Sequence, residues 1–240
     1  DWEVRWAAVE AVAGLTDRAR VRAVDAVGQR VRHADAAVRR SAVQALTRVS
    51  RKGDDLAIAV VSACIEDKAE TVRKAAVAEL VAFVERGDEY ALAAVRARLE
   101  HPRAEVRGTA VDALARLLAE PADEGALLAL TARLGDPTPE VRRLAAEALV
   151  RLAACGARGV VGAVGCLLGR GEGPTRQAAV DVLVKAARSG AELALPEVCE
   201  HAGGEAPEVV ARLISQGGER AVASVCGQLE HLSGEVRRAA

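Results

Sequence analysis

Histidine and cysteine are among the residue types in this chain that could bind a metal ion, and cysteine could also supply a nucleophile. Histidine occurs four times, at His33, His101, His201 and His231. A zinc ion needs three or four ligands within about 2–2.3 Å, so these residues could serve as ligands only if the fold brings them together. The elements that carry them therefore decide whether such a site exists.

The five cysteines lie far apart along the chain, at Cys64, Cys155, Cys166, Cys199 and Cys226. No two of them form a C-x-x-C motif. An odd, scattered set is typical of reduced, buried thiols in an intracellular protein. Cys64, Cys166 and Cys226 have no recurring histidine partner. We therefore expect these cysteines to be buried as small hydrophobic side chains and not to act as nucleophiles.

One ten-residue phrase recurs along the whole chain and sets its architecture. Its Val-Arg pair stands at Val4-Arg5 and returns after intervals of 34, 34, 34, 35 and 34 residues, with threonine replacing valine at the last. The copies are EVRWAAVEAV (3–12), AVRRSAVQAL (37–46), TVRKAAVAEL (71–80), EVRGTAVDAL (105–114), EVRRLAAEAL (140–149) and PTRQAAVDVL (174–183). A fixed period of this length indicates a repeat array.

Each period contains two amphipathic helices. The phrase itself carries apolar residues four and eight positions after its valine, which form one stripe of an α-helix that we call helix B. A second apolar segment precedes it, as in 54–67 and 88–101, and we call it helix A. Gly53, Gly87, Gly156, Gly190 and Gly217 mark the turn before helix A. One hairpin cannot bury its own stripe, so neighbouring hairpins must stack.

Two columns of identical residues run through the helix B copies. The alanine four positions after each valine should lie where helices approach most closely: Ala8, Ala42, Ala76, Ala110, Ala145 and Ala179. The arginine that follows each valine forms the second column: Arg5, Arg39, Arg73, Arg107, Arg142, Arg176 and Arg237.

This pattern resembles the HEAT repeat, most closely the HEAT-like subtype named after phycobilisome lyases, in the armadillo-like superhelix group. The resemblance implies an all-α, right-handed α-solenoid of about seven helix-turn-helix units. It also implies ion pairs between the arginine column and a turn aspartate, which survives at Asp67 and Asp136. His33, His101 and His231, and Arg170 in the sixth unit, occupy the matching places. We expect those histidines to cap the carboxyl end of the preceding helix.

The same alignment answers the question of a metal site. All four histidines fall at the end of helix A, so they are copies of one column and lie one or more repeats apart. They cannot converge on one ion, and we predict neither a metal nor a cofactor. HEAT-repeat iron hydroxylases use His-Glu pairs, and no histidine here is followed by glutamate.

The boundaries of the array are also readable. We predict a single array over 1–240 that begins with helix B of its first unit and forms a segment of a longer protein. Val236-Arg237 stands 61 residues after Thr175-Arg176, seven short of two periods. Seven residues are two helical turns. We therefore place a shortened unit, a candidate hinge, at about 189–216 and a truncated last unit at 217–240.

Composition gives no case for a nucleic-acid or membrane partner across the whole surface. The net charge is −1, which gives no general attraction to nucleic acid or to a membrane surface. The longest apolar run, 159–169, is too short to cross a bilayer. We expect an intracellular, cytoplasmic protein.

The exposed face of the stacked B helices carries the functional prediction. We expect it to line the concave surface, the usual binding face of a solenoid. The candidate partner-binding residues are Trp6, Arg40, Lys74, Arg116, Arg143, Glu147 and Arg151. The sequence favours a non-catalytic scaffold for other proteins. The alternatives are a lyase-like chromophore handler, and a nucleic-acid binder using Arg18, Arg20, Arg22, Arg30 and Arg32.

Overall fold

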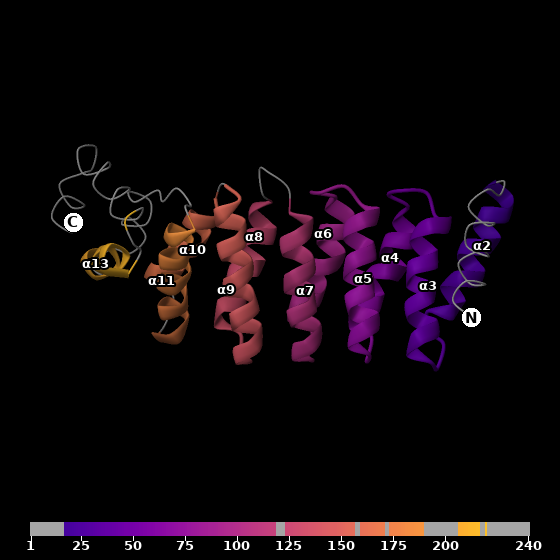
Figure 1. Ribbon diagram of the computed structural model, residues 1–240, viewed down its shortest axis with the longest axis horizontal. Helices are drawn as coiled ribbons and strands as arrows, with labels where there is room; N and C mark the ends of the chain where they lie inside the picture. Colours follow the sequence, from indigo (N-terminus) through magenta and orange to yellow (C-terminus); the bar gives the residue numbers. More distant parts are fainter. Residues whose placement is uncertain are drawn as a thin grey trace. The chain divides into compact units, whose positions relative to one another are not determined.

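The computed structural model describes residues 17–118, 123–156, 159–170, 173–189, 206–216 and 219. Every regular element in these ranges is helical (Figure 1). The chain divides into two compact units, Asp1–Leu117 and Leu118–Ala240. None of the described helices is long and apolar enough to cross a membrane.

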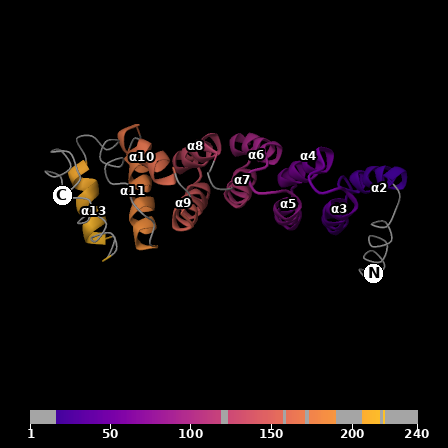
Figure 2. The same ribbon diagram turned by 90° about the horizontal axis from the view of Figure 1, so that it is seen from above.

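The described part of the first unit contains three helical hairpins. Its A helices are α2 (Asp17–Arg30), α4 (Asp55–Ala63) and α6 (Glu89–Arg96), and its B helices are α3 (Ala36–Val49), α5 (Glu70–Phe83) and α7 (Ala104–Leu117). Short 3-10 turns, η1 (Cys64–Glu66) and η2 (Ala97–Glu100), extend α4 and α6. Helices α3, α5 and α7 pack side by side in one layer, and α4 packs on α6 in the other (Figure 2).

The second unit repeats this arrangement. Its A helices are α8 (Glu124–Ala132), extended by η3 (Arg133–Gly135), and α10 (Val160–Arg170). Its B helices are α9 (Pro139–Ala154) and α11 (Gly173–Arg188), and α13 (Ala206–Gln216) packs on α11. Contacts between α8 and α10, and between α9 and α11, stack one hairpin on the next. The A-turn-B unit and the all-α solenoid class predicted from the sequence are confirmed.

Local sequence signals set where the A helices begin. Asp54 accepts a hydrogen bond from the Ala57 amide at 3.0 Å, and Asp88 accepts one from the Ala91 amide at 2.9 Å. These are helix N-caps, which satisfy amides that have no partner within the helix. The glycine just before each cap adopts a left-handed conformation, with φ of 75° at Gly53 and 84° at Gly87. Glycine adopts this conformation without the steric cost of a side chain.

The alanine column is buried within each unit. Ala76, Ala110, Ala145 and Ala179 are fully buried, and Ala42 is 5% exposed. Large side chains on either side, such as Leu80 and Leu114, are also fully buried. Ala8 and the shortened and truncated units predicted beyond 189 fall wholly or largely outside the described residues.

Replacing one member of the alanine column should therefore overpack the stack. Ala76→Leu inserts three carbon atoms where no space remains, and we expect a loss of about 1–3 kcal/mol in the free energy of unfolding. Ala78→Leu, on the exposed side of the same helix, is the matched control. Urea denaturation followed by circular dichroism measures both variants. Equal stability of the two would contradict the assigned packing.

Candidate interaction surface

The arginine column is structural, because its guanidinium groups bind the turn before helix B. In four successive repeats the Nη1 atom donates to the carbonyls six and five residues earlier. Arg73 reaches Asp67 O at 3.0 Å and Lys68 O at 3.1 Å, and Arg107 reaches His101 O and Pro102 O at 2.9 Å each. Arg39 and Arg142 make the same pair of bonds. These carbonyls, which the helices leave without partners, are thereby satisfied.

Arg39 also connects one repeat to the next. Its Nε and Nη2 atoms donate to the two carboxylate oxygens of Asp67 at 2.7 and 2.8 Å. The two side chains are 6% and 11% exposed. Burial alone would raise the pKa of Asp67, but hydrogen bonds from Arg39 and from the Ala69 amide outweigh it and lower that pKa. This is the ion pair between repeats that the family resemblance implied for Asp67.

The predicted role of the histidines in this column is wrong for the two that the structure describes. His33 Nδ1 accepts a hydrogen bond from the Asp35 amide at 3.0 Å, and His101 Nδ1 accepts one from the Arg103 amide at 3.1 Å. Asp67 Oδ1 accepts the equivalent amide, that of Ala69, at 2.8 Å. Histidine therefore replaces aspartate as the acceptor in this turn. The backbone carbonyls of this turn accept hydrogen bonds from the arginine column and not from the histidines.

The residues that could have done metal or thiol chemistry are dispersed. Within the described ranges, no group of three or more His, Cys, Asp or Glu side chains is arranged to hold a metal ion. Burial raises the pKa of the Cys64 thiol to about 11, so the thiol stays protonated near neutral pH and is a poor nucleophile. Cys155 corrects the expectation that all the thiols are buried, because it is exposed at the end of α9.

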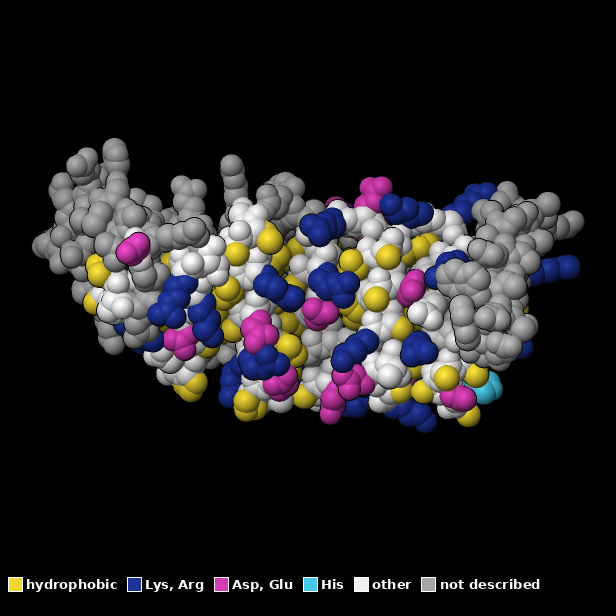
Figure 3. All heavy atoms as spheres, viewed as in Figure 1, with side chains coloured by type: hydrophobic (Ala, Val, Ile, Leu, Met, Phe, Trp, Pro, Cys, Tyr) yellow, Lys and Arg dark blue, Asp and Glu magenta, His cyan; other side chains and the backbone are white. Residues whose placement is uncertain are grey.

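The B-helix face of the first unit is charged but not uniformly paired. Figure 3 shows basic and acidic side chains spread over α5 and α7 with apolar side chains between them. Lys74 pairs with Glu70 at 2.6 Å, and Arg116 lies 3.6 Å from Asp112. Arg40 is exposed and has no ion pair within the described part of the chain.

The exposed side of the B helices in the second unit carries a compact charged cluster. Arg143 donates to Glu140 at 2.6 Å and to Glu147 at 2.5 Å. These two bonds raise the pKa of Arg143, and the bond to Arg143 lowers the pKa of Glu140. All three side chains are more than half exposed, so the cluster can exchange its internal bonds for bonds to a partner. Arg151 is also exposed, one turn beyond Glu147.

The structure adds contacts across repeats that the sequence analysis missed. Arg212 of α13 donates to Asp181 of α11 at 2.9 Å, and Thr47 of α3 donates to Glu79 of α5 at 2.7 Å. Their separations of 31 and 32 residues lie close to the repeat period, which is the signal that could have revealed them. Trp6, the remaining candidate on this face, lies outside the described residues, as do Arg5 and Arg237 of the arginine column.

The stacked hairpins, the buried alanine column and the arginine-bound turns agree with the comparison to protein families. The family model for HEAT repeats matches residues 1–82 and 58–150, which together cover more than half of the chain. The chain belongs to the HEAT-repeat family. None of the curated proteins matches it.

Several solved structures are similar to this HEAT-repeat chain. An engineered protein of the Northeast Structural Genomics Consortium is 18% identical, with a TM-score of 0.45 over 90% of this chain and 97% of that one. A designed armadillo repeat protein is 20% identical, with a TM-score of 0.38 over 89% and 94%. Another, in complex with the peptide (KR)4, is 20% identical, with a TM-score of 0.41 over 90% and 95%.

The buried ion pair between repeats should make stability depend on pH in acid. A carboxylate whose pKa is lowered in the folded state stabilises the protein above the unfolded-state pKa, which is about 3.9 for aspartate. Asp67→Asn should therefore cost about 3 kcal/mol at neutral pH. The difference from the wild type should shrink as the pH falls below about 4 and the wild-type carboxylate is protonated.

Urea denaturation at a series of pH values measures this difference. Asp112→Asn is the control, because that carboxylate pairs with Arg116 on the surface and should contribute less than about 1 kcal/mol. A constant difference between wild type and Asp67→Asn across the acid range would show that the Asp67 charge does not stabilise the fold.

Proposed function

We propose that the chain is a non-catalytic scaffold that binds a partner protein along the face formed by its B helices. The observation that carries this proposal is that structural and exposed positions are separate within each B helix. The arginine and alanine columns are committed to the turns and the core, whereas the residue after the arginine is exposed in four of the five described copies, the buried Gly108 being the exception. Arg40, Lys74, Arg143 and Gln177 occupy that position, so an exposed polar side chain recurs along most of the described B helices.

The chemistry of these side chains indicates what the surface contributes. Exposed charges add little to stability, so the ion pairs of Lys74 and Arg143 can be given up without unfolding the helix. Such charges mainly select a partner and speed its association. Exposed charges that recur along the stack support a binding face that contacts a partner over several repeats.

The two alternatives have different grounds, one in exposed arginines and the other in the family resemblance. Arg22, Arg30 and Arg32 are exposed on and just after α2, which supports the lesser possibility of a nucleic-acid contact at that end. Such binding would weaken steeply as salt is added. The chromophore-handling alternative draws on the subtype resemblance alone, and bound pigment would show it by absorbance.

We also propose that residues 1–240 form a single array, with a hinge in a shortened unit at about 189–216. The B helices line its concave surface in this proposal, and the protein acts without catalysis in an intracellular, cytoplasmic location.

Charge reversal on the B-helix face tests the scaffold proposal. The immobilised chain would be used to capture proteins from a lysate of the source cell, with identification by mass spectrometry. The double variant Arg40→Glu/Lys74→Glu should reduce capture of a specific partner by roughly fivefold or more, because it reverses two recurring contact charges. Arg143→Glu/Arg151→Glu makes the same test in the second unit.

Arg86→Glu is the matched control, because Arg86 is equally exposed but lies in the turn after α5. Circular dichroism of every variant establishes that the helices are intact. If both double variants capture the same partners as the wild type, the B-helix face is not the binding surface.

A further inference from the structure

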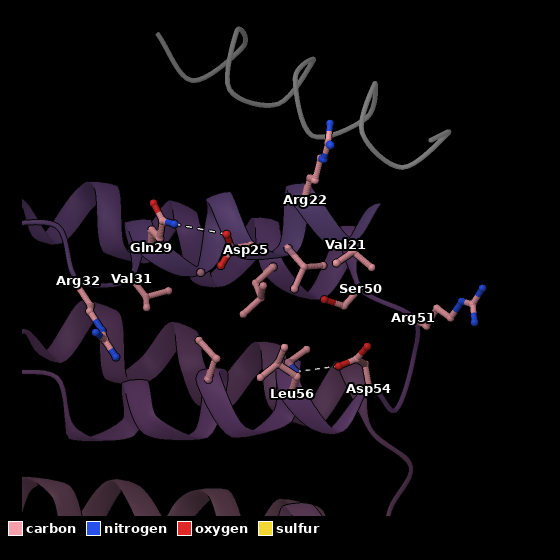
Figure 4. Close-up of a pocket in the computed structure, with 15 residues that line it drawn as sticks. Val21, Arg22, Asp25, Gln29, Val31, Arg32, Ser50, Arg51, Asp54 and Leu56 are labelled. Atoms are coloured by element: carbon pink, nitrogen blue, oxygen red, sulfur yellow. Dashed lines mark hydrogen bonds between the residues drawn. The ribbon is translucent and has the colours of Figure 1, made fainter. Parts of the chain in front are cut away.

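A groove separates the first two described A helices, α2 and α4, on the side of the first unit away from the B-helix face. It consists of two hollows of 940 and 380 Å³, which share Val31, Arg32 and Val60 and so form one depression. Figure 4 shows the larger hollow, with side chains of α2 and α4 on its two walls. We call this depression the α2–α4 groove.

The groove exists because α2 does not bury its apolar stripe as the other A helices do. Ile58, Val61 and Ile65 of the next repeat are fully buried. Their equivalents one repeat earlier, Val24, Val27 and Val31, are only half-buried. A Cβ atom added to Gly28, on the same helix, would meet nothing within 4 Å.

Large aliphatic side chains line both walls of the groove and remain open to solvent. Val21 on α2 is 70% exposed, and Leu56 on α4 is 64% exposed. Val24 of α2, Val60 and Ala57 of α4 and Leu46 of α3 continue the apolar lining between them. The volume of the larger hollow is within the range of about 300–1,000 Å³ that is usual for ligand sites.

The charges around the groove favour an acidic occupant. Arg22 and Arg32 are exposed on its lining and have no ion pair within the described part of the chain. Four carboxylates line the two hollows, and each already has a partner. Asp54 caps α4 and Asp25 accepts a hydrogen bond from Gln29, whereas Asp67 pairs with Arg39 and Glu66 pairs with Arg98. The Ser50 hydroxyl, also in the lining, lacks a hydrogen-bond partner among the described residues.

We propose that the α2–α4 groove binds one amphipathic helix of a partner protein. The bound helix places aliphatic side chains against Val21, Leu56 and Val60, and carboxylates beside Arg22 and Arg32. We expect a helix as the occupant because both walls of the groove are helices. Helices α2 and α4 do not pack against each other as α4 and α6 do, so their apolar stripes have room for another helix here. The hydrophobic contact supplies affinity, and the arginines select acidic over basic helices.

Two synthetic helical peptides test this proposal on the full chain. Both carry the same leucine stripe, flanked by glutamates in one peptide and by lysines in the other. Fluorescence anisotropy should show the glutamate peptide binding at least about tenfold more tightly than the lysine peptide. Leu56→Glu, and separately Arg22→Glu/Arg32→Glu, should each weaken the glutamate peptide by about tenfold or more.

Leu128→Glu is the matched control, because Leu128 is 55% exposed on the A helix α8 and does not line the groove. It should leave the affinity unchanged. The proposal is overturned if neither peptide binds, if both bind equally, or if Leu56→Glu and Leu128→Glu have the same effect. Sedimentation velocity adds a further outcome: a dimer that Leu56→Glu dissociates would identify a second copy of this chain as the occupant and would also overturn it.

Discussion

The burial of each helical stripe against the next hairpin is the interaction on which the structure depends. Leu80 and Ala76 of α5 are fully buried in a helix that packs against α3 and α7 of the neighbouring hairpins and against α4 of its own. No hairpin of this size could stabilise itself alone, since its apolar stripe would face water. The stability of each described unit is therefore a sum over neighbouring pairs, and every other feature of the chain is arranged along that stack.

The arginine column follows from this constraint. Stacking requires a short turn between helices A and B in every repeat, and each turn leaves backbone carbonyls without partners. A buried guanidinium such as that of Arg73 satisfies two of them, and Arg39 in addition reaches Asp67 of the next repeat. Residues needed for stacking are thus buried, and the exposed positions beside them are available for binding.

The period, the helix type and the alanine column could be predicted from the sequence, because each depends on spacing that recurs at about 34 residues. The Asp67 ion pair was expected from the resemblance to HEAT repeats and not from spacing. The histidine hydrogen bonds could not be predicted, since an imidazole can donate or accept and the letter alone does not say which. The α2–α4 groove was also missed. The groove depends on the separation of two helices in space. The apolar stripes of α2 and α4 have similar periodicity in the sequence, so the sequence does not show that only the stripe of α4 is fully buried.

The most direct test of neighbour-to-neighbour stacking is hydrogen exchange on the intact chain with the core substitution Leu80→Ala in α5. This change removes buried atoms and should cost about 2–5 kcal/mol locally. Stacking between neighbours predicts that amide exchange rises most in α5, then in α3 and α7, and stays at the wild-type rate in α11. An equal rise in every helix would show one shared core and would contradict the account.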